Sequence, residues 1–323
     1  MKNMIRMLVG SVAAVMCSAV LGASYPDRAV TIVVPFPAGG TTDVLARHLG
    51  NALANEWGQP VVIENRGGAS GTIGSAAVAR GNADGYTLLV TATHHIINPT
   101  LLKNTIPYDT KATFANVAML ATVPSVLVVN KDFAPKTVQE LIDLAKKKPH
   151  EINFGSAGIG GANHLSGELF AHMADVKLTH IPYRGAAPSL NDLLAGQIPM
   201  MFDSVPGVIA HIQSGALRAL GVTSTERVPQ LPDVPTVSEA GVEGFESIAM
   251  FGMYAPKKIP DDVLQKISED VNRVLSSPDL EEKFNALGAT PGKMSQPEFD
   301  SYVNQEIDKW AEVITAADIK LEQ

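Results

Sequence analysis

Short apolar runs that are typical of buried strands alternate with helix-forming segments along most of this 323-residue chain. The runs are rich in Val, Ile and Leu, and Gly, Pro, Asn or Asp residues bound them, as in parallel strands covered on both faces. They lie at 30–36, 60–65, 86–92, 126–130, 152–157, 178–183, 198–204 and 217–224. This alternation predicts an α/β fold built on parallel sheets.

Helical segments occupy much of the sequence between these runs. Residues 43–54 place their apolar side chains on one stripe, and 188–195 and 205–213 are two further helical segments. Thr137 and Glu140 have the spacing of a capping box at a helix start. From Pro260 onward the chain is predicted to be mainly helical. The apolar run 248–256 predicts a late strand that returns to the first domain.

The first 23 residues have the layout of a secretory signal peptide. Lys2 and Arg6 precede an apolar stretch, and small residues allow cleavage after Ala23. The alternatives are an uncleaved anchor and a lipoprotein attached at Cys17, although Met16 stands where a lipoprotein signal prefers a small residue. Cys17 is the only cysteine, so a cleaved chain has no disulfides and must rely on a large core. We therefore expect a soluble exported protein.

The composition argues against nucleic acid as a partner. Hydrophobic residues make up 46% of the chain and charged residues 18%, which indicates a packed globular protein. The formal net charge is −8, and the longest basic tract is the run of lysines at 146–148. A duplex binder needs a concentrated cationic surface, so no nucleic-acid partner is expected.

Two glycine-rich turns, within 35–43 and 154–170, each follow a strand-like run and lead into a helical segment. Backbone N–H groups at a helix start lack intrahelical acceptors, and glycine lets a ligand approach them closely. Each turn could therefore hold a carboxylate or a phosphate without help from Arg or Lys. The alternative is that Gly39, Gly40, Gly160 and Gly161 only make tight turns.

Known nucleotide and hydrolase motifs are absent. The phosphate loop G-x-x-x-x-G-K-[ST] does not occur, and the dinucleotide motif fails because residue 163 is Asn. The motif G-x-S-x-G fails because Phe154 stands where its first glycine belongs, and H-E-x-x-H is missing. His94 and His95 are adjacent, so on a strand they face opposite ways and cannot bind one metal together. No cofactor, metal or catalytic residue is therefore predicted.

Two carboxylates and one arginine lie near or between these turns. Asp43 follows the first turn and is expected to cap the helix rather than to act as an acid or base. Asp203 ends a strand-like run, where it either accepts a hydrogen bond from a ligand amine, hydroxyl or amide or caps the helix at 205. Arg184 either pairs with a ligand carboxylate or makes a structural ion pair.

Seven segments occur in an order that resembles one receptor family. They are VPFPAGGTTDVLAR, VVIENRGGASGTIG, ADGYTLL, INFGSAGIGGANHLSGELF, HIPYRGAAPSLNDLLAGQI, GALRALGVTSTERVPQLPDVPTVSEAG and APKKIPDDVLQKI. In these segments the chain is similar to the Bug-type extracytoplasmic receptors of tripartite tricarboxylate transporters. The resemblance implies a two-lobed type II periplasmic binding protein with hinge strands and a cleft between the lobes. Residues 24–123 and 249–323 would form one lobe, and residues 124–248 the other.

The resemblance also implies a mode of binding. Backbone amides of two loops, one from each lobe, grip a carboxylate, and these loops match 35–40 and 155–164 in this chain. The segment 93–95 departs from the small residues usual at that place, which leaves the size and polarity of the ligand open. The ligand site is expected to include Phe36, Ala38, Gly39, Gly40, Thr42, Thr93, Ser156, Ala157, Gly160, His164 and Asp203.

The expected function is that of a monomeric periplasmic receptor for a dicarboxylate, a tricarboxylate, an acidic amino acid or an aromatic acid. It would deliver the ligand to the membrane permease of a tripartite tricarboxylate transporter, and it would not be an enzyme. A sensor that presents the ligand to a membrane kinase has the same fold and stays open. The third alternative is an exported hydrolase, with Ser156 near His164 or a metal between His94 and His164.

Overall fold

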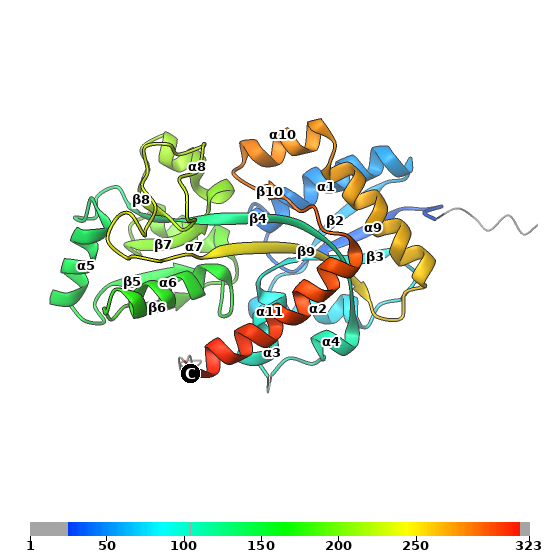
Figure 1. Ribbon diagram of the computed structural model, residues 1–323, viewed down its shortest axis with the longest axis horizontal. Helices are drawn as coiled ribbons and strands as arrows, with labels where there is room; N and C mark the ends of the chain where they lie inside the picture. Colours follow the sequence, from blue (N-terminus) through cyan, green and yellow to red (C-terminus); the bar gives the residue numbers. More distant parts are fainter. Residues whose placement is uncertain (1–24, 104, 317–323) are drawn as a thin grey trace, which may run out of the picture.

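The computed structural model describes residues 25–103 and 105–316 and has an α/β fold with two lobes (Figure 1). The predicted signal peptide, residues 1–23, and Cys17 within it lie outside the described residues. The strands are β1 (Val30–Val34), β2 (Val61–Asn65), β3 (Thr87–Ala92), β4 (Phe114–Asn130), β5 (Asn153–Ser156), β6 (Thr179–Pro182), β7 (Met200–Ser204), β8 (Leu217–Val222), β9 (Ile248–Pro256) and β10 (Thr290–Pro291).

The helices fill the intervals between the strands and form the C-terminal region. They are α1 (Thr41–Trp57), the short 3₁₀ helix η1 (Ala69–Gly71), α2 (Thr72–Ala79), α3 (His94–Leu101), α4 (Thr110–Thr113), α5 (Val138–Lys147), α6 (Ala162–Met173), α7 (Ala186–Leu194), α8 (Val205–Gln213), α9 (Asp261–Leu275), α10 (Pro278–Ala286) and α11 (Gln296–Ala316). None of the helices in the described ranges is long and apolar enough to cross a membrane.

Parallel strands form the centre of each lobe. In the first lobe β1 lies between β2 and β3, and all three run parallel. In the second lobe β5 lies between β6 and β7, again in parallel. These strands confirm the predicted parallel α/β architecture, whereas β4 and β9 pair in antiparallel fashion and make the whole sheet mixed.

Strand β4 carries the chain from the first lobe to the second. Its residues 114–124 pair with β9, and its residues 125–130 pair with β7 and β8. The predicted strand at 248–256 is confirmed as β9, and β4 and β9 run side by side across the middle of the molecule (Figure 1). The sequence pattern predicts only 126–130 of β4. It misses the first half because Asn116 and Thr122 interrupt a run of small apolar residues, although α9 and α11 bury this half.

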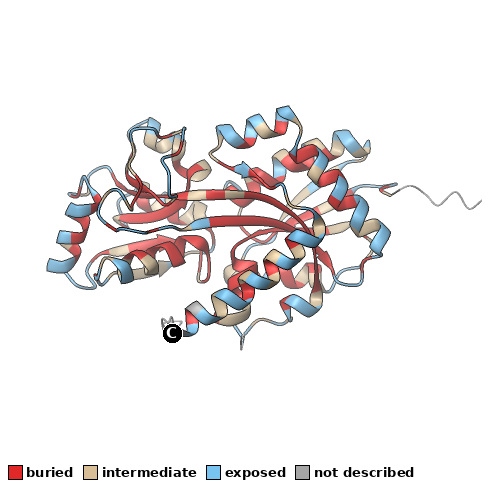
Figure 2. Ribbon diagram, viewed as in Figure 1, coloured by how far each residue is buried: buried red, intermediate tan, exposed pale blue. Residues whose placement is uncertain are grey.

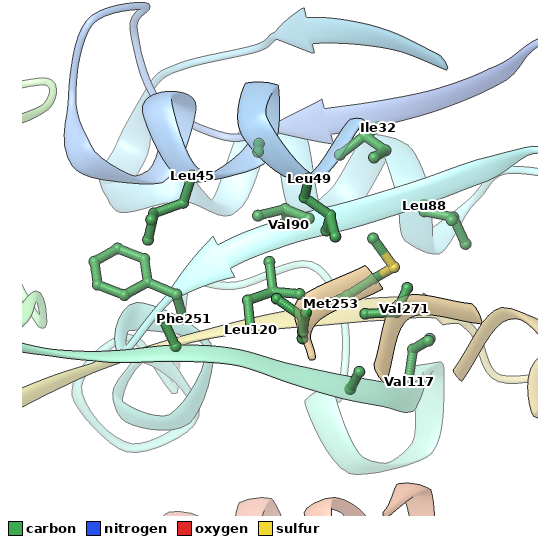
Figure 3. Packing of buried hydrophobic residues seen from close by; sticks show 14 of the residues in the cluster. Ile32, Leu45, Leu49, Leu88, Val90, Val117, Leu120, Phe251, Met253 and Val271 are labelled. Carbon is green, nitrogen blue, oxygen red and sulfur yellow. The ribbon is translucent and has the colours of Figure 1, made fainter. Parts of the chain in front are cut away.

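The hydrophobic core is divided between the lobes. Most strands are buried, whereas β2 and β6 at the two ends of the sheet are partly exposed, and the helices expose mainly their outward faces (Figure 2). In the first lobe Leu45 and Leu49 of α1 pack in one cluster with Val90 of β3 and Phe251 of β9 (Figure 3). In the second lobe the strands β4, β5 and β7 pack against α5 and α6. Each lobe therefore buries a large apolar core without any disulfide.

Several local predictions can be compared with the structure. The capping box of α5 is confirmed, because the amide of Glu140 donates to Thr137 Oγ1 at 3.1 Å. The helical region after Pro260 is confirmed as α9, α10 and α11, which share cores with the first lobe. The strand geometry considered for His94 and His95 does not apply, because the predicted run 86–92 stops before them. Strand β3 ends at Ala92, and both histidines belong to the first turn of α3.

We propose that residues 24–123 with 249–323 form the first lobe and residues 124–248 the second. The change of partners along β4, between Pro124 and Ser125, supports this boundary. The lobes also touch at the start of α6, where Ala162 and Leu165 join clusters otherwise made by the first lobe, together with Ile159 of the preceding turn. The cleft described below lies beside this contact.

The packing of α6 on β5 requires a glycine. A Cβ on Gly167 would lie 2.2 Å from Cε2 of Phe154, whose side chain is fully buried. We expect Gly167→Ala to lower the free energy of unfolding by about 1–3 kcal/mol in urea titrations, because the close-packed core cannot yield. In a Phe154→Leu background, Gly167→Ala should lower the free energy of unfolding clearly less, and a double-mutant cycle measures this difference. Equal costs in both backgrounds would show that this contact does not set the packing.

Candidate functional site

A cleft between the lobes is lined by both of the predicted glycine-rich turns. It contains about 470 Å³ of space between atoms, open solvent included. The first lobe contributes Phe36, Pro37, Gly40, Thr41, Thr42, Ala92, His94, Ala249 and Phe251, and the second contributes Ala157, Ala162, Asn163, Ala186, Asp203 and Ser204. The lining of the cleft thus comes from both lobes.

Four helices begin at this cleft without a side-chain cap. Their N-cap residues are Gly40 for α1, Gly161 for α6, Gly185 for α7 and Ser204 for α8, and none of these makes a side-chain capping bond. Helices α4, α5 and α10, by contrast, are capped by the side chains of Asp109, Thr137 and Ser277. The uncapped starts leave backbone N–H groups and positive dipole ends directed at the cleft, which favours an anion there.

The first glycine-rich turn is held in shape by Asp43. Its Oδ2 accepts hydrogen bonds from the amide of Gly39 at 3.0 Å and from Nε of Arg47 at 2.9 Å, and its Oδ1 accepts from Nδ2 of Asn65 at 2.9 Å. Burial raises the pKa of Asp43, but these hydrogen bonds outweigh burial and lower it overall. Asp43 therefore clamps the turn from behind. The amide of Gly39 is engaged in this clamp, while Gly40 and Thr42 line the cleft.

The second turn is held by side chains beneath it. The amide of Gly160 donates to Nδ1 of His164 at 3.3 Å, and the amide of Gly158 donates to Oγ of Ser156 at 3.1 Å. Ser156 Oγ also lies 2.6 Å from Nε2 of His180, whose ring stacks on His164 with centroids 4.0 Å apart. Ser156 is fully buried and pairs with His180 rather than with His164, so the Ser156–His164 pair of the hydrolase alternative is not formed.

Three buried side chains of the cleft have polar atoms without hydrogen-bond partners. They are Oγ1 of Thr41, both ring nitrogens of His94 and Oδ2 of Asp203. The other carboxylate oxygen of Asp203 accepts from Nδ2 of Asn163 at 2.9 Å and from the amide of Ser204 at 2.8 Å. Burial raises the pKa of Asp203 to about 7 in spite of these bonds. Unpaired buried atoms are costly, and a bound ligand could pair them.

His94 forms a wall of the cleft. Its ring packs on Phe36 with centroids 4.8 Å apart, and a Cβ on Gly161 would lie 2.5 Å from its Cε1. Burial, and then the neighbouring His164, lower the pKa of His94 to about 3, so the ring is neutral. His95 instead stacks on Tyr254 in the core at 3.8 Å, away from the cleft. Of the two adjacent histidines, only His94 faces a ligand.

The cleft brings together some of the predicted site residues and leaves others outside it. Phe36, Gly40, Thr42, Ala157 and Asp203 line it. The other predicted residues do not line it. Ala38 and Gly39 are exposed on the first turn, as is Arg184, and Ser156, Gly160 and His164 lie behind the second turn. Thr93 is also outside the lining, and its Oγ1 accepts a hydrogen bond from the amide of Met250.

Other lining residues were not among the expected ones. Thr41 and Asn163 occupy the first turns of α1 and α6, where helix-start geometry could have indicated them. Ala186 and Phe251 come from distant segments, and their small or apolar side chains carry no sequence signal of a site. Within the described residues, no group of three or more His, Cys, Asp or Glu could hold a metal ion.

A family model described as tripartite tricarboxylate transporter family receptor matches residues 45–319, which is most of the chain. The protein belongs to this receptor family. This result confirms the predicted family. It also agrees with the expectation that the chain binds a solute and is not an enzyme.

Solved structures agree with this assignment. The receptor is similar to the periplasmic binding protein BugD, with 38% identity and a TM-score of 0.87 over 92% of this chain and 99% of BugD. It is similar to R. palustris Rpa4515 with adipate, with 37% identity and a TM-score of 0.88 over 92% and 99% of the two chains. It is also similar to MatC from Rhodopseudomonas palustris with bound malate, with 32% identity and a TM-score of 0.84 over 90% of this chain and 100% of MatC. These likenesses confirm the two-lobed periplasmic-binding-protein fold.

The buried histidines make the stability of the receptor depend on pH. Burial lowers the pKa of His94, His95 and His180 to about 3 and that of His164 to about 4. Unfolding exposes these rings, which then take up protons below about pH 6.5. The free energy of unfolding should therefore fall as the pH drops from about 6.5 toward 4. Asp203 has the opposite effect because its folded pKa is raised, so the folded state takes up a proton there. This one proton offsets only one of the four that the histidines take up on unfolding.

His95→Phe tests this dependence away from the cleft. The variant should match the parent near pH 7.5 in urea titrations, because a phenyl ring fits the same apolar surroundings. Its stability should then fall less steeply on acidification, by about 1.4 kcal/mol per pH unit. His172→Gln on the exposed face of α6 should keep the parental slope. An unchanged slope in His95→Phe would contradict the role assigned to burial.

Proposed function

We propose that the protein is a periplasmic receptor for a small carboxylate, which it holds in the interlobe cleft and delivers to a tripartite tricarboxylate transporter. The observation that carries the proposal is that uncapped helix starts from both lobes, α1 and α6, line one cleft. Their backbone N–H groups suit a carboxylate, which accepts several hydrogen bonds at once. The relatives with adipate and malate support the choice of a carboxylate.

Backbone groups alone provide enough affinity for such a role. Each hydrogen bond to a charged group contributes about 1.5–3 kcal/mol net, so four give roughly 6–12 kcal/mol before ordering costs. A micromolar affinity corresponds to about 8 kcal/mol. No Lys or Arg is among the described residues that line the cleft, so the amides are the principal partners of the anion.

Proline at the first position of α6 tests the role of one amide. Ala162→Pro removes the N–H at that position but suits the helix, because proline is accepted at N1 and Gly161 has the extended ψ of 159° that a following proline needs. Helix α10 already begins with Pro278. We expect the dissociation constant of the tightest ligand in a panel of adipate, malate, glutamate and benzoate to rise about tenfold or more by calorimetry.

Asp261→Pro is the matched control, since it places proline at the first position of α9, away from the cleft. It should leave the affinity unchanged. Both variants should unfold in urea close to the parent. If Ala162→Pro folds normally and binds as tightly as the control, the amide at the start of α6 does not hold the ligand.

Contact between the lobes at Gly161 should be needed for tight binding. Gly161 has a φ of −78°, so alanine suits its backbone, but the added Cβ would press against the buried ring of His94. Gly161→Ala should therefore hinder closure and raise the dissociation constant about tenfold, whereas in a His94→Ala background it should have little effect. The same loss of affinity in both backgrounds would show that this contact does not control closure.

A further inference from the structure

A second part of the cleft presents hydrogen-bond acceptors, whereas the helix starts present N–H donors. Asp203 lies at the end of β7 in the second lobe, and Thr41 begins α1 in the first. A Cβ on Gly207 would lie 3.0 Å from Oδ2 of Asp203 and 3.4 Å from Oγ1 of Thr41. The two oxygens therefore both lie beside Gly207, one from each lobe. Both are buried, and neither has a hydrogen-bond partner.

The orientation of Asp203 is set by its neighbours. Nδ2 of Asn163 donates to Oδ1 of Asp203 and also to the carbonyl of Phe202, each at 2.9 Å. The amide of Ser204 donates to the same Oδ1 at 2.8 Å. These bonds fix the carboxyl group with Oδ2 as its free atom. An ionised carboxylate can only accept hydrogen bonds, so this position needs a donor.

We propose that the ligand is an acid that also carries a hydrogen-bond donor, a hydroxyl or an ammonium group, and that Asp203 and Thr41 recognise this donor. This inference rests on the proposed function, because the amides of α1 and α6 must hold the carboxylate at the same time. A donor placed between the two oxygens pairs both of them and removes the cost of burying them unpaired. An unsubstituted chain leaves them unpaired, and a second carboxylate is repelled by an ionised Asp203.

Matched sets of acids test the inference by calorimetry on the full mature chain. Succinate, malate and aspartate share a four-carbon skeleton and differ in having a hydrogen, a hydroxyl or an ammonium group at one carbon. Glutarate, 2-hydroxyglutarate and glutamate form the same set with five carbons, and adipate is a longer unsubstituted acid. In at least one set the hydroxy or amino acid should bind about tenfold tighter than its unsubstituted parent at pH 8.

Two conservative variants connect this preference to its residues. Thr41→Val keeps the shape and the backbone amide, and Asp203→Asn keeps the size while removing the charge. Each should reduce the preference for the donor-bearing acid over its unsubstituted parent about fivefold or more. Retention of the full preference in both folded variants would overturn the assignment. Urea titrations of both variants check that they fold.

The pH dependence separates two states of Asp203. With a donor-bearing ligand the preference should grow as the pH rises through about 7, because Asp203 then ionises. His94 is the other titratable residue among the described residues that line the cleft, and its lowered pKa keeps it neutral above pH 6. If the preference for the donor-bearing acid instead falls as the pH rises through about 7, Asp203 does not accept a hydrogen bond from the ligand and the inference is wrong.

The remaining outcomes distinguish the inference from the proposed function. Equal binding of all members within each of the two sets, or binding of adipate alone, would refute the donor preference and leave the carboxylate receptor intact. If none of the seven acids binds to a folded receptor, the proposed carboxylate function fails together with the inference.

Discussion

The antiparallel pairing of β4 with β9 is the contact on which the binding site depends. Their ladder of backbone hydrogen bonds ends at the boundary between the lobes, where Pro124 pairs with Ile248 and β4 continues into the second lobe. The two glycine-rich turns lie far apart in the sequence, yet this pairing brings the ends of β1 and β5 to one cleft.

The cleft keeps hydrogen-bonding capacity that the fold itself does not use. Side chains such as Asp43 and His164 bond the turns from behind and rigidify them, so little backbone freedom is lost when a ligand arrives. The helix starts, Thr41 and Asp203 stay unpaired on the side of the ligand. These unpaired atoms lower the stability of the free protein, and a bound ligand that hydrogen-bonds to them removes this cost.

The sequence predicts the parts of the fold whose signal is local. Apolar runs bounded by turn residues reveal β1 and β9, and the spacing of Thr137 and Glu140 reveals the start of α5. It does not predict the first half of β4, since burial there comes from distant helices. It also does not predict α3, which begins at His94, because a polar pair after a strand carries no helical period. Ala186 and Phe251 line the cleft only because the two lobes meet there, and neither local sequence contains a signal of this contact.

The charges of the cleft explain how an acidic protein can select an anion. The chain has a net charge of −8, so long-range attraction does not favour carboxylates. Helix dipoles and amides act only over a few ångströms, in a cleft where burial strengthens each interaction. Asp203 adds local repulsion against an anionic group in the wrong place. Under the proposed function, attraction at one end and repulsion at the other would orient a ligand that has a carboxylate at one end and a donor at the other, which neither feature would achieve alone.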